Sequence, residues 1–288
     1  MKQLSYWQRV KVAFQYVMPQ QYLTQLAGWF AKQKWGKVTH FVIKLFAQKY
    51  KVDMREAKLE QYSDYASFNE FFIRELKEGV RPIDDNPNTL CQPADGRISQ
   101  CGRIDEELLL QAKGHFFSLS DLLANDQELV DTFKNGTFAT TYLSPRDYHR
   151  VHMPCDGTLR KMLYVSGELF SVNPFLAEHV PNLFARNERV ICVFDTAFGP
   201  MVQILVGATI TASISVQWEG VINPPRSQEI KTWDYDGSIK LEKGAQMGAF
   251  QLGSTVINLF VKDAVQLAEQ LTVDTVTKVG EILAQGSK

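Results

Sequence analysis

The chain has 288 residues, of which 45% are hydrophobic and 22% charged, with 11 prolines and 18 glycines. This composition excludes a disordered chain, a collagen-like repeat and a coiled coil, and the length suffices for one large domain or two packed ones. Its four cysteines form no C-x-x-C pair, so neither a zinc ribbon nor a thioredoxin-like redox site is expected. The net charge of −1 argues against a general nucleic-acid-binding protein.

Positive charge is concentrated at the start of the chain. Residues 1–51 contain nine Lys or Arg and no Asp or Glu, a charge of +9 that leaves −10 (22 − 32) for the remainder. Aromatic residues are interleaved with these lysines, a composition typical of segments that lie on anionic membrane surfaces. The alternative is that these segments pack on the protein's own core, and the absence of carboxylates favours the bilayer.

We expect the chain to lie on a membrane rather than to cross it. Lys or Gln interrupts every apolar stretch before it reaches about 18 residues, so no transmembrane helix is expected. A signal peptide is not expected either, because Lys2 is followed by mixed polar residues without a compact apolar segment. A mitochondrial transit peptide fits poorly, because the segment is rich in lysine and aromatic residues and poor in serine.

Short helices are expected at the N-terminal end. Two are predicted at about residues 5–17 and 20–34, separated by Pro19, where a new helix can begin but an old one should not continue. Apolar residues then recur with helical spacing at Val38, Phe41, Val42, Leu45 and Phe46. Lysines lie toward the other side, which predicts a third, amphipathic helix. A further helical or turn-rich section spans residues 67–76.

Strands dominate from about residue 90 onward. Segments rich in β-branched and aromatic residues, mostly separated by Gly, Pro or Asp, lie at 97–103, 137–143, 158–165, 188–195, 201–218 and 255–261. A short helix is predicted at 119–124, capped by Ser118 or Ser120. The sequence therefore predicts an α+β fold in which N-terminal amphipathic helices precede a mainly antiparallel β core.

Three places supply residues of the types that nucleophilic catalysis requires: Asp95, His149 with His152, and Ser254. A serine hydroxyl becomes a nucleophile when a base takes its proton, and that base works best when a carboxylate fixes its tautomer. The G-x-S-x-G elbow of α/β-hydrolases is absent, because the sequence around Ser254 lacks the second glycine.

Each of these residues also has a purely structural interpretation. Asp95 before a glycine is typical of a turn, and Ser254 after Gly253 fits a tight turn between two strands. His149 and His152 would share a helical face as metal ligands, but they lie in an extended stretch where residues three apart point to opposite faces. A structural histidine remains the alternative for at least one of them.

Several segments of the chain form recognisable motifs: Phe71-Phe72-x-Arg74, Arg81-Pro82-Ile83, Pro93-Ala94-Asp95-Gly96, the run from Tyr142 to Pro154, Gly167–Asn173, Asn182–Arg189 and Leu252-Gly253-Ser254-Thr255. Through these motifs the sequence resembles the bacterial phosphatidylserine decarboxylase proenzymes over nearly the whole chain. A basic amphipathic N-terminus independently fits an enzyme whose substrate resides in a membrane.

The resemblance implies a self-processing enzyme. It implies cleavage between Gly253 and Ser254 into a β chain, 1–253, and an α chain of 35 residues (288 − 253), with Asp95 orienting His152 and His152 activating Ser254. Ser254 would become a covalent pyruvoyl group, the only cofactor implied, which forms a Schiff base with phosphatidylserine and yields phosphatidylethanolamine and CO2. His149 would donate the proton that replaces the carboxylate. No metal is implied.

The resemblance also sets expectations about organisation and partners. Residues 1–66 would form the membrane-associating region and 67–288 the catalytic domain, at the cytoplasmic side of the cell membrane. The substrate would be phosphatidylserine in anionic membranes, the α and β chains would stay associated, and two processed protomers would form a homodimer, without nucleic acid. The alternatives are a serine hydrolase or peptidase that stays in one piece, and a peripheral membrane scaffold.

Overall fold

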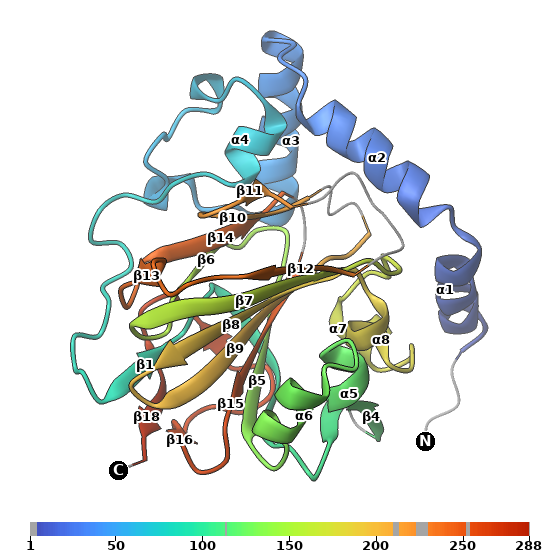
Figure 1. Cartoon of the computed structure of the whole chain (residues 1–288). Coiled ribbons are helices and arrows are strands. Elements are labelled where there is room, and N and C mark those ends of the chain that lie inside the picture. Colours follow the sequence, from blue (N-terminus) through green and yellow to red (C-terminus); the bar gives the residue numbers. More distant parts are fainter. Residues whose placement is uncertain (1–4, 113, 210–212, 223–229, 252–253, 288) are drawn as a thin grey trace.

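The structure is a computed structural model that describes residues 5–112, 114–209, 213–222, 230–251 and 254–287, with the backbone alone at 254. The chain opens with helices α1 (Tyr6–Val17), α2 (Gln20–Ala31), α3 (Lys37–Tyr50) and α4 (Phe68–Phe72), with two short 3-10 turns at Met54–Glu56 and Tyr62–Asp64. Figure 1 shows these helices along the top and one side of the β core, with α3 and α4 side by side. The predicted fold class is confirmed.

Local sequence explains where the first helices begin and end. Ser5 caps α1 through a reciprocal capping box with Gln8, and α2 begins directly after Pro19. Gly36 precedes α3 with a φ of 55°, a conformation that glycine adopts without steric cost. The three helices expected from the sequence are therefore present, with α2 three residues shorter than predicted.

A nine-stranded antiparallel sheet forms the body of the protein. Its path runs β12-β7-β8-β9-β15-β5-β2-β17, and β13 also pairs with β7. The strands are β2 (Gly96–Arg103), β5 (Thr137–Leu143), β7 (Gly157–Val165), β8 (Arg189–Thr196), β9 (Gly199–Val206), β12 (Lys231–Asp234), β13 (Lys240–Leu241), β15 (Ser254–Phe260) and β17 (Val276–Thr277). Strands far apart in sequence are thus neighbours, with β15 lying between β9 and β5.

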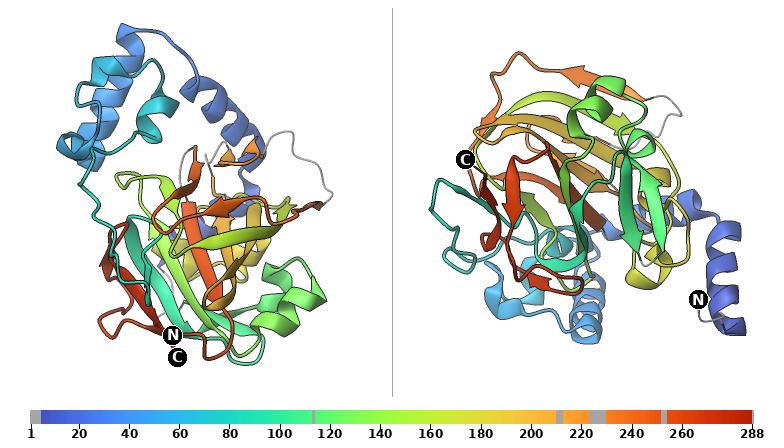
Figure 2. Two further views of the ribbon diagram at one scale, coloured as in Figure 1. Left: turned by 60° about the vertical axis from the view of Figure 1, so that its left-hand side comes forward. Right: turned by 90° about the horizontal axis from the view of Figure 1, so that it is seen from below.

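Three smaller sheets complete the β core. A four-stranded sheet joins β6 (Arg150–His152), β10 (Ile214–Val216), β11 (Gly220–Val221) and β14 (Gln246–Phe250), and a three-stranded sheet joins β1 (Thr89–Cys91), β16 (Val265–Leu267) and β18 (Ile282–Gly286). Strands β3 (Leu108–Ala112) and β4 (His115–Ser118) form a hairpin. The remaining helices are α5 (Leu119–Leu122), α6 (Gln127–Phe133), α7 (Pro174–Ala177) and α8 (Leu183–Arg186). Figure 2 shows this β body from two further sides.

Both faces of the large sheet are buried. Along β15, Ile257 and Leu259 pack into one apolar cluster, whereas Val256 and Phe260 pack into the other. This alternation follows from the two-residue period of a strand. The helices α5 to α8 cover the first cluster, which explains why the central strands read as nearly continuous apolar runs.

Most predicted strands are confirmed, and one is wrong. The segment 201–218 was expected to be a single strand, but β9 ends at Val206 and β10 begins at Ile214. β9 belongs to the nine-stranded sheet and β10 to the four-stranded sheet. The chain leaves one sheet and enters another here, a change that composition does not reveal. The predicted helix at 119–124 is present as α5, capped by Ser118.

Candidate active site

One edge of the large sheet collects the residues that the sequence singled out. Tyr142, near the end of β5, pairs with Arg97 of β2 on one side and with Thr255 of β15 on the other. Neighbouring strands are about 4.8 Å apart, so β2 and β15 run about 10 Å from each other with β5 between them. Asp95 therefore precedes β2, and Ser254 opens β15, at the same end of this three-strand unit.

Gly96 makes this arrangement possible on the β2 side. A Cβ atom at position 96 would lie 2.3 Å from the backbone oxygen of Tyr142, closer than any real contact. Glycine therefore lets β2 approach β5 directly after Asp95. The Asp-Gly pair is more than a simple turn signal here, because the carboxylate of Asp95 is buried and the glycine begins a strand.

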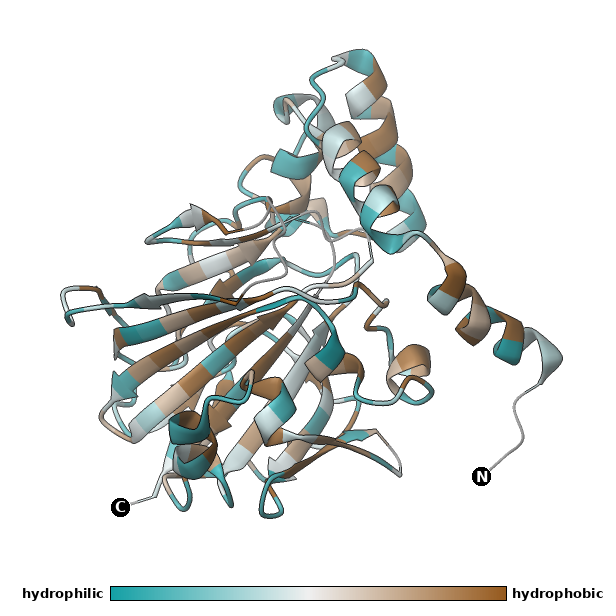
Figure 3. Cartoon of the chain, turned by 45° about the vertical axis from the view of Figure 1, so that its right-hand side comes forward, coloured by the Kyte–Doolittle hydropathy of each residue, from teal (hydrophilic) through white to brown (hydrophobic). Residues whose placement is uncertain are grey.

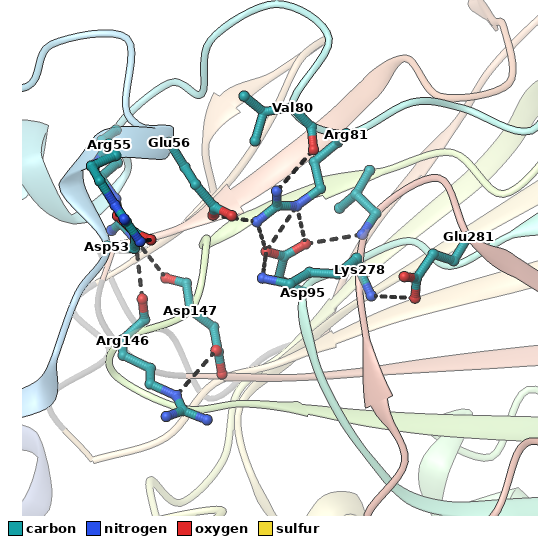
Figure 4. A network of polar contacts seen from close by, with 12 residues as sticks. Asp53, Arg55, Glu56, Val80, Arg81, Asp95, Arg146, Asp147, Lys278 and Glu281 are labelled. Carbon is teal, nitrogen blue, oxygen red and sulfur yellow. Dashed lines mark hydrogen bonds and ion pairs between the residues drawn. The ribbon is translucent and has the colours of Figure 1, made fainter.

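Asp95 is held by three donors. Its side chain is 2% exposed and accepts a two-pronged hydrogen bond from Arg81, at 2.6–3.1 Å, with further bonds from Lys278 Nζ at 3.3 Å and Val279 N at 2.9 Å. Figure 4 shows Arg81 between Asp95 and Glu56. Burial by itself raises the pKa of Asp95, but the bonds and charge of Arg81 outweigh it and hold the pKa below its usual value.

His152 is oriented by a backbone carbonyl and a tyrosine. Its Nδ1 lies 2.8 Å from Gly244 O and its Nε2 lies 3.0 Å from the hydroxyl of Tyr148. Since a carbonyl only accepts, this network assigns the proton to Nδ1 and leaves Nε2 to accept from Tyr148. Burial lowers the pKa of His152, so the imidazole is neutral at neutral pH.

Asp95 was expected to orient His152 directly, but the two side chains bond to other groups. Both ring nitrogens of His152 are engaged by Gly244 and Tyr148, while the carboxylate of Asp95 is engaged by Arg81, Lys278 and Val279. The two residues are still neighbours, because His152 N donates to Pro93 O, and the charge of Asp95 favours the cationic form of His152. Asp95 thus affects the pKa of His152 only as a nearby charge, and the larger effect of the Arg150 charge opposes it.

His149 occupies a separate, drier environment. It is fully buried, its ring centroid lies 4.1 Å from that of Phe72, and its Nδ1 lies 2.8 Å from Asp147 O. Its Nε2 has no hydrogen-bond partner among the described residues. Burial lowers the pKa of His149 to about 3, which makes this imidazole neutral with a free nitrogen.

The backbone connects His149 with the predicted cleavage segment. Phe250 N donates to His149 O, so His149 lies opposite the last residue of β14, four positions before Ser254. Ser254 itself is paired with Leu143 of β5. Gly253 and the side chain of Ser254, and with them the predicted cleavage bond, lie outside the described residues.

Two cavities meet at Tyr148. One, of about 220 Å³, is lined by Arg74, Asp95 and Asp147 among others, and the second, of about 630 Å³, is lined by Arg81 and His152 among others. Tyr148 lines both, and burial raises its pKa to about 12, so its hydroxyl stays protonated. Asp95 therefore borders open space on one side of this tyrosine and His152 on the other, whereas His149 lines neither cavity.

The described residues contain no candidate metal-binding site. No group of three or more His, Cys, Asp or Glu in the described part of the chain is arranged to hold a metal ion. His149 and His152 each direct Nδ1 at a different backbone carbonyl. Across the same residues, no helix has both the length and the apolar character needed to cross a membrane.

Sequence reasoning assigned no role to several residues of this site. Arg81 and Tyr148 stood in the motifs without a function, and Gly244 and Lys278 were not singled out. The Asp95 contacts join residues 14 and 183 positions apart, so no local pattern could have paired them. One local signal for such residues was available: a charged or hydroxyl-bearing residue within an otherwise apolar motif, such as Arg74 in Phe71-Phe72-x-Arg74.

Comparisons with known proteins agree with this geometry. The sequence profile of the family described as phosphatidylserine decarboxylase matches residues 68–285, and a second profile, described as PSD, matches residues 10–51. The chain is 76% identical to a phosphatidylserine decarboxylase proenzyme of Haemophilus influenzae over 282 residues, covering 97% of both chains. It is 74% identical over 284 residues to the proenzyme of that name from Pasteurella multocida, covering 98% of this chain and 96% of the relative. The chain therefore belongs to the phosphatidylserine decarboxylase family.

Proposed function

We propose that this chain is a proenzyme that cleaves itself between Gly253 and Ser254 and then converts phosphatidylserine to phosphatidylethanolamine and CO2. The observation that carries the proposal is the position of Ser254 at the start of β15, beside the end of β5 and across it from buried Asp95. The names of the relatives do not favour a serine hydrolase or a scaffold.

In the proposed cleavage, His152 is the general base. Its neutral imidazole has its lone pair on Nε2, and the charge of Asp95 stabilises the cation that forms when it takes the proton of Ser254. The serine oxygen attacks the Gly253 carbonyl carbon, the peptide C–N bond breaks, and an ester forms. Elimination then breaks the bond between Cβ of residue 254 and the ester oxygen, which releases the β chain as a carboxylate. Hydrolysis by water releases the nitrogen of residue 254 as ammonia and leaves a pyruvoyl group.

The surroundings fit a pyruvoyl group at position 254. This group supplies a ketone that condenses with the amine of the substrate and accepts the electron pair left when CO2 departs. His149 contributes the nearby proton-transfer group: its buried Nε2 has no partner within the described residues, and its backbone is bonded to Phe250. In the proposal His149 takes up a proton on Nε2 and delivers it to the carbon that lost CO2.

The two chains would stay associated after cleavage. Residues 254–288 contribute β15, β16, β17 and β18. Of these strands, β15 pairs with β5 and β9 of the β chain, β17 pairs with β2 and β18 pairs with β1. β15 is bonded on both sides along its length, so breaking the bond before it leaves the sheet intact. Assembly of two processed protomers into a homodimer is also part of the proposal.

We propose that residues 1–66 hold the enzyme on the cytoplasmic surface of the cell membrane and that residues 67–288 carry out the chemistry. No residue of α1 is buried, and exposed aromatic residues include Trp7 and Phe14 on α1, Trp29 on α2 and Phe41 on α3. Figure 3 shows apolar and polar residues interspersed along these helices. Nine cations without a single acid in residues 1–51 add attraction to anionic lipids such as phosphatidylserine.

The test is conversion of the lipid. The purified full chain is incubated with vesicles of phosphatidylcholine and phosphatidylserine, and the extracted lipids are analysed by mass spectrometry beside a Ser254→Ala sample. We expect phosphatidylethanolamine to accumulate with the wild type and not with Ser254→Ala. Accumulation of free fatty acid or lysolipid instead would indicate a hydrolase and contradict the proposal.

A further inference from the structure

Arg74 is a buried cation whose hydrogen-bonding capacity is only partly used. Arg74 is 4% exposed, and its Nη2 donates to the backbone oxygens of Arg146, at 3.0 Å, and Asp147, at 3.4 Å. Nε and Nη1 have no partner among the described residues, and no carboxylate there forms an ion pair with Arg74. A buried guanidinium normally forms a forked bond to an anion, because leaving its donors unsatisfied is costly.

An open cavity lies beside this arginine. Arg74 lines the space of about 220 Å³, together with the cations Lys51 and Arg97, which form no ion pair in the described part of the chain. The acids of the wall, Asp53, Glu56, Asp95 and Asp147, each accept a hydrogen bond from another group of the protein. Lys51 and Arg97 thus remain available to an anion that enters, and Arg74 lies in the same wall with two buried nitrogens that lack a partner among the described residues.

The cavity is coupled to His149 by a shared carbonyl. The backbone oxygen of Asp147 accepts from Arg74 Nη2 and also from His149 Nδ1. An anion bound by the free nitrogens of Arg74 would therefore lie near the imidazole for which we propose a role in proton transfer. The positive charge of Arg74 also helps to keep His149 neutral.

We propose that Arg74 and this cavity bind the phosphate group of the phospholipid substrate. This inference rests on the proposed function, because the phosphate and the α-carbon of a phosphoserine headgroup are separated by one oxygen and one methylene carbon. Binding of the phosphate at Arg74 would therefore position the α-carbon for the chemistry at His149 and residue 254. The cavity is smaller than the roughly 300–1,000 Å³ of drug-sized ligand sites, so it suits a headgroup whose acyl chains remain outside.

The test measures binding directly, on the uncleaved full-length Ser254→Ala protein. Glycerophospho-L-serine, inorganic phosphate and L-serine are titrated by calorimetry into Ser254→Ala alone and into Ser254→Ala with Arg74→Gln. We expect the dissociation constant of glycerophospho-L-serine to rise about tenfold or more with Arg74→Gln, since a charge-assisted bond is lost. Inorganic phosphate should compete with glycerophospho-L-serine, and L-serine should bind far more weakly.

Two further variants keep the result interpretable. Arg103→Gln is the matched control, because Arg103 is exposed, pairs with Asp263 and does not line the cavity, so affinity should not change. If Arg74→Gln does not fold, the double variant Lys51→Gln with Arg97→Gln should weaken binding several-fold, with a smaller effect at high salt.

Three results would overturn the inference. The first is equal affinity for glycerophospho-L-serine with and without Arg74, and the second is binding of L-serine as tight as that of glycerophospho-L-serine. The third is binding of inorganic phosphate with no binding of glycerophospho-L-serine. The third would identify a site for a free anion rather than for a headgroup. Because the titrated protein is uncleaved, these outcomes are independent of whether the wild type decarboxylates the lipid.

Discussion

Tyr148 donates its hydroxyl to Nε2 of His152 across 3.0 Å, while Nδ1 of the same ring is fixed by Gly244 O. In the intact chain, the nitrogen that accepts the serine proton in the proposed cleavage is therefore already bonded to a tyrosine. This bond stabilises the neutral imidazole, because its lone pair is the acceptor. Burial favours the same neutral form and is the main cause that lowers the pKa of His152.

Replacement of Tyr148 by phenylalanine should shift the pH dependence of self-cleavage. Without the donor the pKa of His152 rises, so the midpoint of the rate against pH should move to higher pH. The rate is measured on newly synthesised protein by gel electrophoresis at several pH values. Tyr65→Phe is the control, because it removes a hydroxyl bonded to Leu59 O outside the site. An unshifted midpoint in Tyr148→Phe would exclude this role.

The two histidines should be separable by mutation. His152→Ala and Asp95→Ala should remain uncut, because one removes the proposed base and the other the charge that stabilises its cation. His149→Ala should still be cut but should decarboxylate poorly, by roughly the hundredfold or more typical of a lost proton-transfer group. Denaturing electrophoresis reports the first effect and lipid analysis the second. An uncut His149→Ala protein would show that this division of roles is wrong.

Burial of neutral His149 should make the fold sensitive to mild acid. Its pKa is lowered from 6.5 to about 3, so the unfolded chain binds a proton that the folded chain does not as the pH falls below 6.5. This residue therefore removes about 1.4 kcal/mol of stability per pH unit between those values. Urea unfolding of Ser254→Ala between pH 7 and 5 measures the slope. Addition of His149→Gln should make that slope smaller, and an unchanged slope would contradict the assignment.

Loss of Arg81 should lower the stability of the fold, because it removes an ion-pair partner of the buried Asp95 carboxylate. The carboxylate of Asp95 is 2% exposed and the side chain of Arg81 10% exposed, and removal of one member of such a buried pair costs about 3–5 kcal/mol. Arg81→Gln should therefore lower the urea midpoint and raise the pKa of Asp95, slowing self-cleavage most at low pH. Arg55→Gln, which breaks an exposed pair with Asp53, should leave both properties near wild type. Equal effects of the two substitutions would refute this view of Asp95.

Exposed aromatic residues of α1 should contribute to membrane binding. Trp7 and Phe14 are 72% and 56% exposed, so their replacement by serine should leave the fold intact. Binding to phosphatidylserine-containing vesicles should weaken about a hundredfold or more, since each aromatic side chain buried in the bilayer contributes about 1.5–3 kcal/mol and two are lost. Phe116→Ser is the matched control, because Phe116 is 52% exposed on β4, outside the basic helices. Sedimentation with vesicles measures the binding, and equal loss in the control would argue against a role for α1.

The sequence predicted the elements whose signals are local. β5 spans residues 137–143 as expected, and α5 has its expected cap at Ser118, because strand composition and capping depend on neighbouring residues. The break between β9 and β10 was missed because both segments are apolar and β-branched, and only the partner strands distinguish them. Long-range pairing is information that a single sequence read locally does not contain.

In the candidate site, too, the sequence predicted which residues matter locally but not their long-range contacts. Asp95, His149, His152 and Ser254 were singled out by residue type and by resemblance to a family, and the structure brings their backbones to one region. How the side chains are held was not predictable. The bond from Tyr148 to His152 replaced the expected bond from Asp95, because Arg81 and Lys278, from distant segments, occupy the carboxylate.

Intact mass spectrometry under denaturing conditions tests most directly whether the chain matures by cutting itself before Ser254. The wild type should give two chains, 1–253 and 254–288, and the shorter one should carry a ketone in place of its amino terminus. Ser254→Ala should give one chain of 288 residues. A single unmodified wild-type chain that nevertheless decarboxylates phosphatidylserine would contradict the account.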